Sequence, residues 1–290
     1  MKLVTWNIQW GLGCDGNVDL ERIVKTAKAL SDADIFCFQE ISHGFAPHDG
    51  GEDQPAILAS LLPGYTPVFR PAVERRDGNG RPQVFGNMIL SRLPVMDVTS
   101  HILPWPATEC RSMQRQALEV VVATDLGPFR ITTCHLEYHA DEHRRAQVEQ
   151  IRKVHEEHER RARLTHRDVS EGPYRSLPAP VGALVCGDFN LGPDDPLHAE
   201  MRKPFASGVP AFVDAWTIRH GDAPHAPTTG VADFTQWPQG PHCRDYIFVT
   251  ENVADRIVDL RVDGETTASD HQPVAITLRA SDAKVGTGFA

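Results

Sequence analysis

The stretch that most constrains the fold is Ala183–Pro193, with the sequence ALVCGDFNLGP. Its first half is a short apolar run of the length of a buried strand. Gly187 then permits a sharp turn of the backbone, and Asp188 and Asn190 follow two residues apart. In an extended chain this spacing places a carboxylate and an amide on one face. The same pattern also fits a strand that ends in a turn, where Asp and Asn only cap backbone groups.

Further apolar runs of strand length end or begin at polar residues. These expected strands cover residues 2–8, 35–38, 65–69, 84–91, 118–123, 129–136, 181–186, 245–249, 256–262 and 274–278. The polar residues at their ends are Asn7, Glu40, His135, Asp188, Asn190, Asp245, Asp270 and His271. Taken alone, each of the acids also fits a solvated loop. Because α/β folds place their ligand-binding sites at strand ends, these residues as a set predict a functional site.

Helices are expected between several of these strands. The helical patterns cover residues 18–30, with Asn17 as the N-cap, and residues 54–62, 140–163 and 194–203. The third is rich in Glu, Arg and His, and we expect solvent on most of its sides. Residues 70–83 carry four arginines and an Asn-Gly pair, which indicates an exposed hairpin or loop. We assign residues 1–280 to one domain and expect a frayed tail at 281–290.

The composition sets bounds on partners and compartment. The 290 residues carry a formal net charge of -10, which repels polyanions and restricts any nucleic-acid contact to local arginines. The six cysteines are widely spaced without a C-x-x-C pair, which indicates a reduced chain with no disulfide framework or structural zinc motif. Neither a secretion signal nor an apolar run of membrane-spanning length is visible. We therefore expect a soluble, cytoplasmic monomer without a membrane anchor.

Two histidine patterns raise the question of zinc. His135, His139 and His143 are spaced four apart, but His135 ends a strand pattern and so shares no helical face with the other two. The segment His155–His158 reads H-E-E-H, whose spacing of three differs from that of the H-E-x-x-H zinc signature. A zinc enzyme based on the first three histidines is kept as an alternative.

Four carboxylates among the strand-end residues define the expected chemistry. If Glu40, Asp188, Asp245 and Asp270 meet at one spot, they repel one another unless a cation lies among them. Oxygen ligands from Glu, Asp and Asn select a hard ion such as Mg²⁺ or Mn²⁺. The sequence therefore predicts a site for a divalent cation.

In their order along the chain, the motifs resemble those of the endonuclease/exonuclease/phosphatase superfamily, which has the fold of pancreatic deoxyribonuclease. The matching motifs, which extend from residue 4 to residue 274, are TWNIQ, FQE, GNMILSR, TTCHL, GDFN, RDYIF and SDH. The resemblance implies an α/β (α+β) fold, a four-layer sandwich of two packed mixed β-sheets flanked by helices. It also implies metal-assisted hydrolysis of a phosphoester, either a phosphodiester or a phosphomonoester, at one edge of the sandwich.

The resemblance also implies the metal ligands and a charged pair. Glu40 is the main metal ligand, helped by Asn7 and Asp270. Asp245 pairs with His271, which fixes the tautomer of the imidazole and stabilises its charged form.

Water activation and phosphate binding are assigned in the same way. Asp188 orients or deprotonates the attacking water, and His271 is the alternative base. Asn190 and His135 donate to the phosphoryl oxygens.

The substrate is less constrained than the chemistry. Arg115 falls where many members carry an arginine that faces the phosphate, with Arg111 as the alternative. The motifs of inositol-phosphate hydrolases are missing, since Leu191-Gly192 follows the D-x-N and residues 242–245 read HCRD. Gln9 stands where abasic-site endonucleases have an acid. The substrate therefore stays open between nucleic acid, nucleotide, sugar and lipid phosphoesters. A nuclease acting on DNA or RNA and a catalytically silent binding module are the alternative functions.

Overall fold

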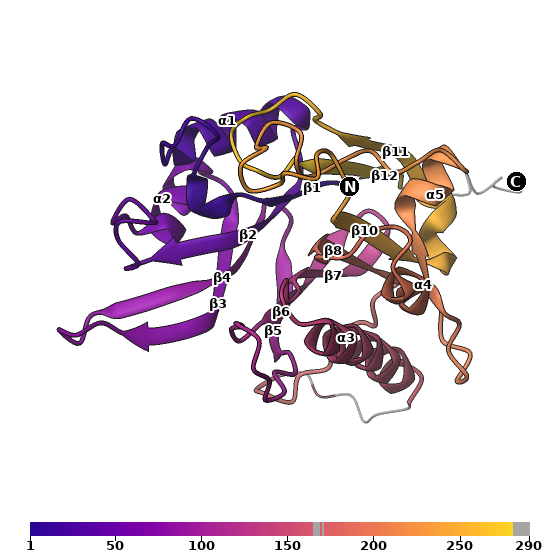
Figure 1. Cartoon of the computed structure of the whole chain (residues 1–290). Helices are drawn as coiled ribbons and strands as arrows, with labels where there is room; N and C mark the ends of the chain where they lie inside the picture. The colour runs from indigo at the N-terminus through magenta and orange to yellow at the C-terminus, as the bar shows by residue number, and fades with distance from the viewer. Residues whose placement is uncertain (165–168, 170, 281–290) are drawn as a thin grey trace, which may run out of the picture.

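A computed structural model describes residues 1–164, 169 and 171–280, in which two six-stranded sheets pack face to face (Figure 1). The tail at 281–290, expected to fray, lies outside the described residues. The strands of the first sheet are β1 (Lys2–Asn7), β2 (Ile35–His43), β3 (Thr66–Arg76), β4 (Pro82–Ser91), β11 (Ile257–Val262) and β12 (Val274–Leu278). Those of the second are β5 (Val95–Ile102), β6 (Gln116–Thr124), β7 (Gly127–His135), β8 (Gly182–Asp188), β9 (Phe212–Asp214) and β10 (Asp245–Thr250).

The two sheets share one pattern of strand directions. Their strand orders are β11-β12-β1-β2-β4-β3 and β5-β6-β7-β8-β10-β9. Each sheet has a single parallel pair at its centre, β1 with β2 and β7 with β8. The remaining neighbours are antiparallel. Both sheets are therefore mixed, as predicted.

Helices cover the outer faces of the sheets (Figure 1). The α-helices are α1 (Leu20–Leu30), α2 (Gln54–Leu61), α3 (Asp141–Ala162), α4 (Pro196–Arg202) and α5 (Ala215–His220), and the 3-10 helices are η1 (Gln9–Gly11) and η2 (Glu251–Arg256). Helices α1 and α2 pack on the first sheet, and α3 and α4 pack on the second. Helix α5 packs against β10 and β11. The predicted α/β sandwich of two mixed sheets flanked by helices is confirmed.

Burial of apolar side chains explains these layers. The faces that the two sheets turn toward each other carry fully buried residues such as Ile35, Leu118 and Leu184. Helix α1 follows a helical period, so that Leu20, Ile23, Val24 and Ala27 fall on the face turned to β1 and β2. Among the described residues, no helix is long and apolar enough to cross a membrane.

The structure corrects several expected elements. Strand β2 continues to His43 instead of ending before Gln39, because a bulge between Phe38 and Ile41 absorbs one irregular step of the ladder. The N-cap of α1 is Asp19, whose side chain accepts from the backbone of Arg22, and not Asn17. Strand β5 and helix α5 were not predicted. Residues 70–83 do form a hairpin, built from β3 and β4.

Helix α3 is much more buried than its polar sequence predicts. His143, Arg144, Arg152 and His155 lie on its buried face. Two of them bond backbone carbonyls there: Arg152 Nη1 donates to Met201 O (2.9 Å) and His155 Nε2 bonds Pro210 O (2.8 Å). Because long polar side chains reach such partners while their stems pack on apolar surface, composition alone overestimated the exposure of this helix.

Candidate active site

The strand directions bring the predicted site residues to one edge of the sandwich. Asn7 and His135 end β1 and β7, and each parallel partner supplies a carboxylate at the same edge, Glu40 on β2 and Asp188 on β8. Asp245 begins β10 directly opposite Asp188 in the antiparallel ladder. Asp270 and His271 precede β12, the antiparallel neighbour of β1. Side chains from both sheets therefore meet there.

Asn7 links the two carboxylates of the parallel pairs. Its Nδ2 donates to Glu40 Oε1 (3.0 Å) and to Asp188 Oδ2 (3.1 Å). Its Oδ1 accepts from the backbone of Gln9 (3.1 Å), which fixes the amide orientation. Glu40 stands at the β2 bulge with a φ of 63°, a left-handed conformation that is strained for a residue with a side chain. A bulge changes the direction of a side chain, which explains how the carboxylate of Glu40 reaches the site although this residue lies inside a strand.

Two of the carboxylates lie in surroundings that disfavour their negative charge. Burial and the negative charge of Asp270 raise the pKa of Glu40 to about 7. Burial likewise raises the pKa of Asp270, whose Oδ2 accepts from Gln236 Nε2 (2.8 Å) and Trp237 Nε1 (3.1 Å). This local excess of negative charge, on oxygen donors, fits a divalent hard cation beside Glu40 and Asp270.

Asp245 and His271 form a close buried pair. His271 Nδ1 donates to Asp245 Oδ2 (2.8 Å), and the ring Nε2 then points toward Asp188 Oδ2 at 3.7 Å. Burial would lower the pKa of His271, but the negative charges of Asp245 and Asp188 outweigh it and raise that pKa well above its ordinary value. Burial also raises the pKa of Asp245 to about 6. At neutral pH the pair is therefore an imidazolium beside a carboxylate.

The pKa shifts of Asp188 and His135 favour an ionised carboxylate and a neutral imidazole. Burial alone would raise the pKa of Asp188, but the positive charge of His271 and the hydrogen bonds to the carboxylate bring it below its ordinary value. Burial and the charge of Arg115 hold the pKa of His135 well below its ordinary value. The neutral His135 ring places Nε2 3.5 Å from Asp188 Oδ2 and 3.8 Å from Glu40 Oε1.

Asn190 lies beside Asp188 with both amide hydrogens engaged. Its Nδ2 donates to the carbonyl of Leu136 (3.0 Å) and to Asp188 Oδ2 (3.3 Å), while its backbone N–H donates to Asp188 Oδ1 (2.9 Å). Arg244 Nη1 donates to its Oδ1 at 3.5 Å. In this arrangement Asn190 orients Asp188, and donation to a substrate oxygen requires one of its two partners to be exchanged.

Arg115 faces the site from the start of β6. Its Nε donates to the buried Glu137 (3.3 Å), while its Nη1 is buried without a hydrogen-bond partner in the described part of the chain. An unpaired guanidinium nitrogen at the wall of a cleft is suited to an anion. Arg111, the alternative at this position, also lines the cleft but is exposed.

Most of these residues line one cleft of about 710 Å³; Asn7 and Asp245 are not among its lining residues. Its walls also carry Trp10, Phe45, Arg75, Tyr138 and Trp237, which add aromatic and basic surface. Residues that sequence reasoning missed are Glu137, Gln236, Trp237 and Arg244. Gln236 and Trp237 lie in a loop dense in Pro, Thr and Gly, where no periodic pattern marks a residue. Two of the four carried a signal: Glu137 is an acid just past a strand end, and Arg244 precedes Asp245 in the motif RDYIF.

The three histidines considered for zinc do not form a group. Within the described residues, the sets of His, Cys, Asp and Glu donors close enough for a metal do not include His135 with His139 and His143. His143 is buried on α3, whereas His135 ends β7 and His139 lines the cleft. The zinc alternative based on these residues therefore has no geometric support.

A family model described as "Endonuclease/Exonuclease/phosphatase family" matches residues 4–271. Comparison with curated proteins gave no match.

Solved structures share the fold. An endonuclease/exonuclease/phosphatase from Beutenbergia cavernae is 23% identical with a TM-score of 0.69, and the match covers 97% of this chain and 71% of that one. The mannosyl-6-phosphatase Bt3783 of Bacteroides thetaiotaomicron is 17% identical (TM-score 0.63; 96% and 99% covered). The human Nocturnin catalytic domain with bound sulfate is 19% identical (TM-score 0.60; 95% and 92% covered).

Proposed function

The chain belongs to the endonuclease/exonuclease/phosphatase family, and from this membership we propose that it hydrolyses a phosphoester with the help of Mg²⁺ or Mn²⁺. The observation that carries the proposal is the convergence of Asn7, Glu40, Asp188 and Asp270 with the Asp245–His271 pair at one edge of the sandwich. No position implied by the resemblance is replaced, which disfavours a catalytically silent binding module.

Glu40, Asp270 and Asn7 would hold the cation. When bound, it supplies positive charge that polarises a phosphoryl oxygen and offsets the carboxylates. The raised pKa values of Glu40 and Asp270 support this assignment, because both groups gain from a neighbouring cation. Gln236 and Trp237 hold Asp270 in place through two hydrogen bonds to one oxygen.

Asp188 is the proposed base. Its lowered pKa keeps the carboxylate ionised at neutral pH, and hydrogen bonds from Asn7 and Asn190 fix its orientation. His271 is the proposed alternative base, but its raised pKa favours the imidazolium, which suits donation to an oxygen that gains charge. Asp188 would thus accept the proton of the attacking water, and His271 would donate to an oxygen of the phosphoryl group.

Arg115 and His135 are the proposed contacts to the phosphoryl oxygens. The buried, unpaired Nη1 of Arg115 supports its role, and Glu137 holds the guanidinium from behind. The neutral His135 donates one hydrogen bond without adding charge, and Asn190 would join it after exchanging a partner. The sugar phosphatase and the sulfate-bound catalytic domain that share this fold are consistent with an anion at such a site.

The test is a panel of phosphomonoesters, phosphodiesters and nucleic acids with Mg²⁺ or Mn²⁺ and an EDTA control. Hydrolysis should be lost in EDTA and return with the added cation. Asp188→Asn should lower kcat by at least about 10²-fold with an unchanged circular dichroism spectrum, because the amide keeps the shape but accepts no proton. Asp222→Asn, at an exposed loop residue, is the matched control. Full activity in EDTA, or an active Asp188→Asn variant, contradicts the proposal.

A further inference from the structure

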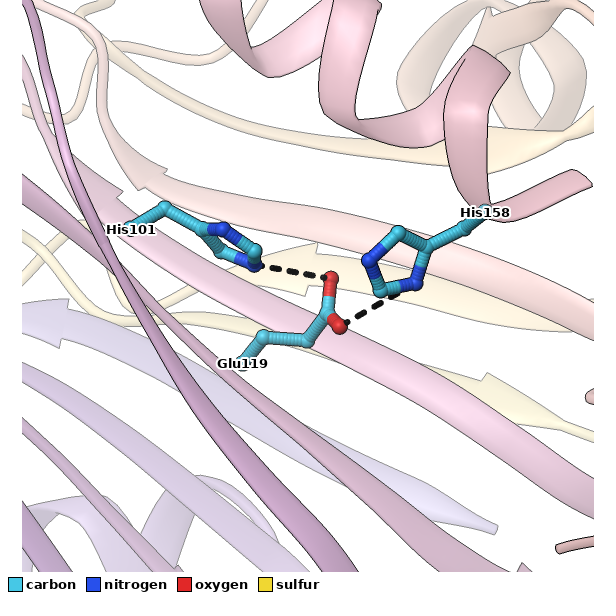
Figure 2. Close-up of side chains that lie close together, drawn as sticks. All are labelled: His101, Glu119 and His158. Atoms are coloured by element: carbon cyan, nitrogen blue, oxygen red, sulfur yellow. Dashed lines mark ion pairs between the residues drawn. The ribbon is translucent and has the colours of Figure 1, made fainter. Parts of the chain in front are cut away.

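A second group of metal-type donors lies away from the cleft, between the outer face of the second sheet and helix α3. It consists of His101 on β5, Glu119 on β6 and His158 on α3 (Figure 2). Figure 2 shows the two carboxylate oxygens turned to different rings: Oε2 lies 3.6 Å from His101 Nε2 and Oε1 lies 3.5 Å from His158 Nδ1. The mechanism proposed above uses none of the three.

These separations are long for hydrogen bonds, which join N and O at about 2.7–3.2 Å. Donor atoms bound tetrahedrally to zinc at about 2.1 Å lie about 3.4 Å apart, close to the observed separations. His101 Nε2 is moreover buried and without a hydrogen-bond partner among the described residues. A buried imidazole nitrogen that faces a carboxylate without bonding to it leaves a position for an ion.

The chain contains an internal comparison for this geometry. His198, Asp214 and His225 have similar residue types, but both rings contact the same oxygen, Asp214 Oδ2, at 2.9 and 2.6 Å. Those are ordinary hydrogen-bond lengths, so His198, Asp214 and His225 form a hydrogen-bonded triad. The two groups therefore differ in their spacing.

The surroundings of Glu119 also suit a metal ligand. Thr132 Oγ1 donates to Oε2 (3.2 Å), the kind of outer contact that orients ligating carboxylates. Arg130 Nε lies 3.8 Å from the same oxygen, but the Nη2 of this arginine is paired with Glu159 (3.2 Å), which offsets its charge. A cavity of about 10 Å³ beside the group has room for roughly one water; His101, Glu119 and Arg130 line it, and His158 does not.

We propose that His101, Glu119 and His158 form a binding site for a divalent transition metal, with Zn²⁺ as the ion to test. Imidazole nitrogens favour such metals over Mg²⁺. The ion would join the consecutive strands β5 and β6 to helix α3, which comes later in the sequence. This site is independent of the cation proposed for the cleft.

The experiment uses the full chain, freed of metal and dialysed against Zn²⁺, in a Glu40→Gln background that disables the cleft site. Bound zinc is measured by mass spectrometry, and Co²⁺ in its place reports the ligands through its visible absorption. About one zinc ion per chain is expected, with a rise of the melting temperature. Adding His158→Gln should abolish the binding, the absorption band and the temperature shift, whereas His225→Gln should leave all three unchanged.

His158 is partly exposed, so its glutamine variant should fold; His101→Gln on a different element gives a second test of the same ligand set. Loss of all zinc in the Glu40→Gln background would show that zinc binds only in the cleft and would overturn the proposal. Zinc binding that survives both histidine substitutions would overturn it as well. Hydrolysis with Mg²⁺ should be unaffected by His158→Gln, which separates this proposal from the proposed function.

Discussion

Replacing Trp237 with phenylalanine tests whether Asp270 binds the cation. The substitution removes the Nε1–H that donates to Asp270 Oδ2 (3.1 Å) and keeps an aromatic ring, over which the guanidinium of Arg244 lies 4.9 Å from the centroid. Hydrogen bonds to charged groups contribute about 1.5–3 kcal/mol. Loss of such an outer contact typically weakens metal affinity by about 10–100-fold. Since Gln236 still donates to the same oxygen, we expect the lower end of that range.

The assay needs no substrate. Mg²⁺ is titrated into metal-free protein and the binding is followed by calorimetry or by the melting temperature, so that the dissociation constant is obtained directly. The control is Trp216→Phe, which removes an indole bond to the carbonyl of Ala223 (2.9 Å), and neither of these residues lines the cleft. An Mg²⁺ affinity of Trp237→Phe within about 2-fold of the parent would refute the reasoning, because the hydrogen bond would then not support a metal ligand.

Three further predictions concern stability, catalysis and partners. Burial lowers the pKa of His155 to about 4, so the folded chain keeps the ring neutral and loses about 2 kcal/mol of stability as the pH falls from 7.5 to 5. The free energy of unfolding is measured in urea with EDTA at several pH values. The variant His155→Gln should show a smaller loss of stability at low pH than the parent, whereas Phe205→Leu, at a ring beside His155, should show the same loss. An equal pH dependence in the parent and His155→Gln would contradict the role of His155. Asp245→Asn should lower kcat by about 10²–10⁴-fold in a folded protein, because His271 loses its charge partner; near-normal turnover would exclude that role. With a net charge of -10, binding to duplex DNA should be weak and its logarithm should fall with log salt at a slope of about -2 to -4, whereas a slope near -8 indicates a dedicated DNA enzyme.

Much of the architecture was predictable because the central strands are buried on both faces. Residues 35–38 and 183–186 read as continuous apolar runs, and they became the inner parts of β2 and β8. Strand β5 was missed because it is an edge strand whose residues are only partly buried, so its sequence, VMDVTSHI, shows no alternation. Edge strands leave a weaker pattern than central ones, since one side of their ladder faces no partner.

The residues that converge at this edge of the sandwich were named from the sequence, but the contacts that hold them were not. Glu40 could be identified as an acid after an apolar run, whereas the bulge that gives it a φ of 63° follows from pairing with β4, which local sequence does not encode. Trp237 reaches Asp270 from a long irregular loop, and Glu119 meets His101 and His158 only through sheet register and helix packing. Short motifs report neighbours along the chain, and these contacts are between residues distant in sequence.

The spacing of the two sheets sets the geometry of the site. The first sheet supplies Asn7 and Glu40 and the second supplies Asp188, so the 3.1 Å bond from Asn7 to Asp188 crosses from one sheet to the other. Directly before Glu40 in β2, the fully buried Gln39 Nε2 donates to Thr5 (3.1 Å) on its own sheet and to Thr133 (2.8 Å) on the other. The Nε2 group loses a hydrogen bond if either sheet shifts, so this link favours one relative position of the sheets. The proposed cation ligands belong to the first sheet and the proposed base, Asp188, to the second, so a shift of either sheet would separate the base from the cation.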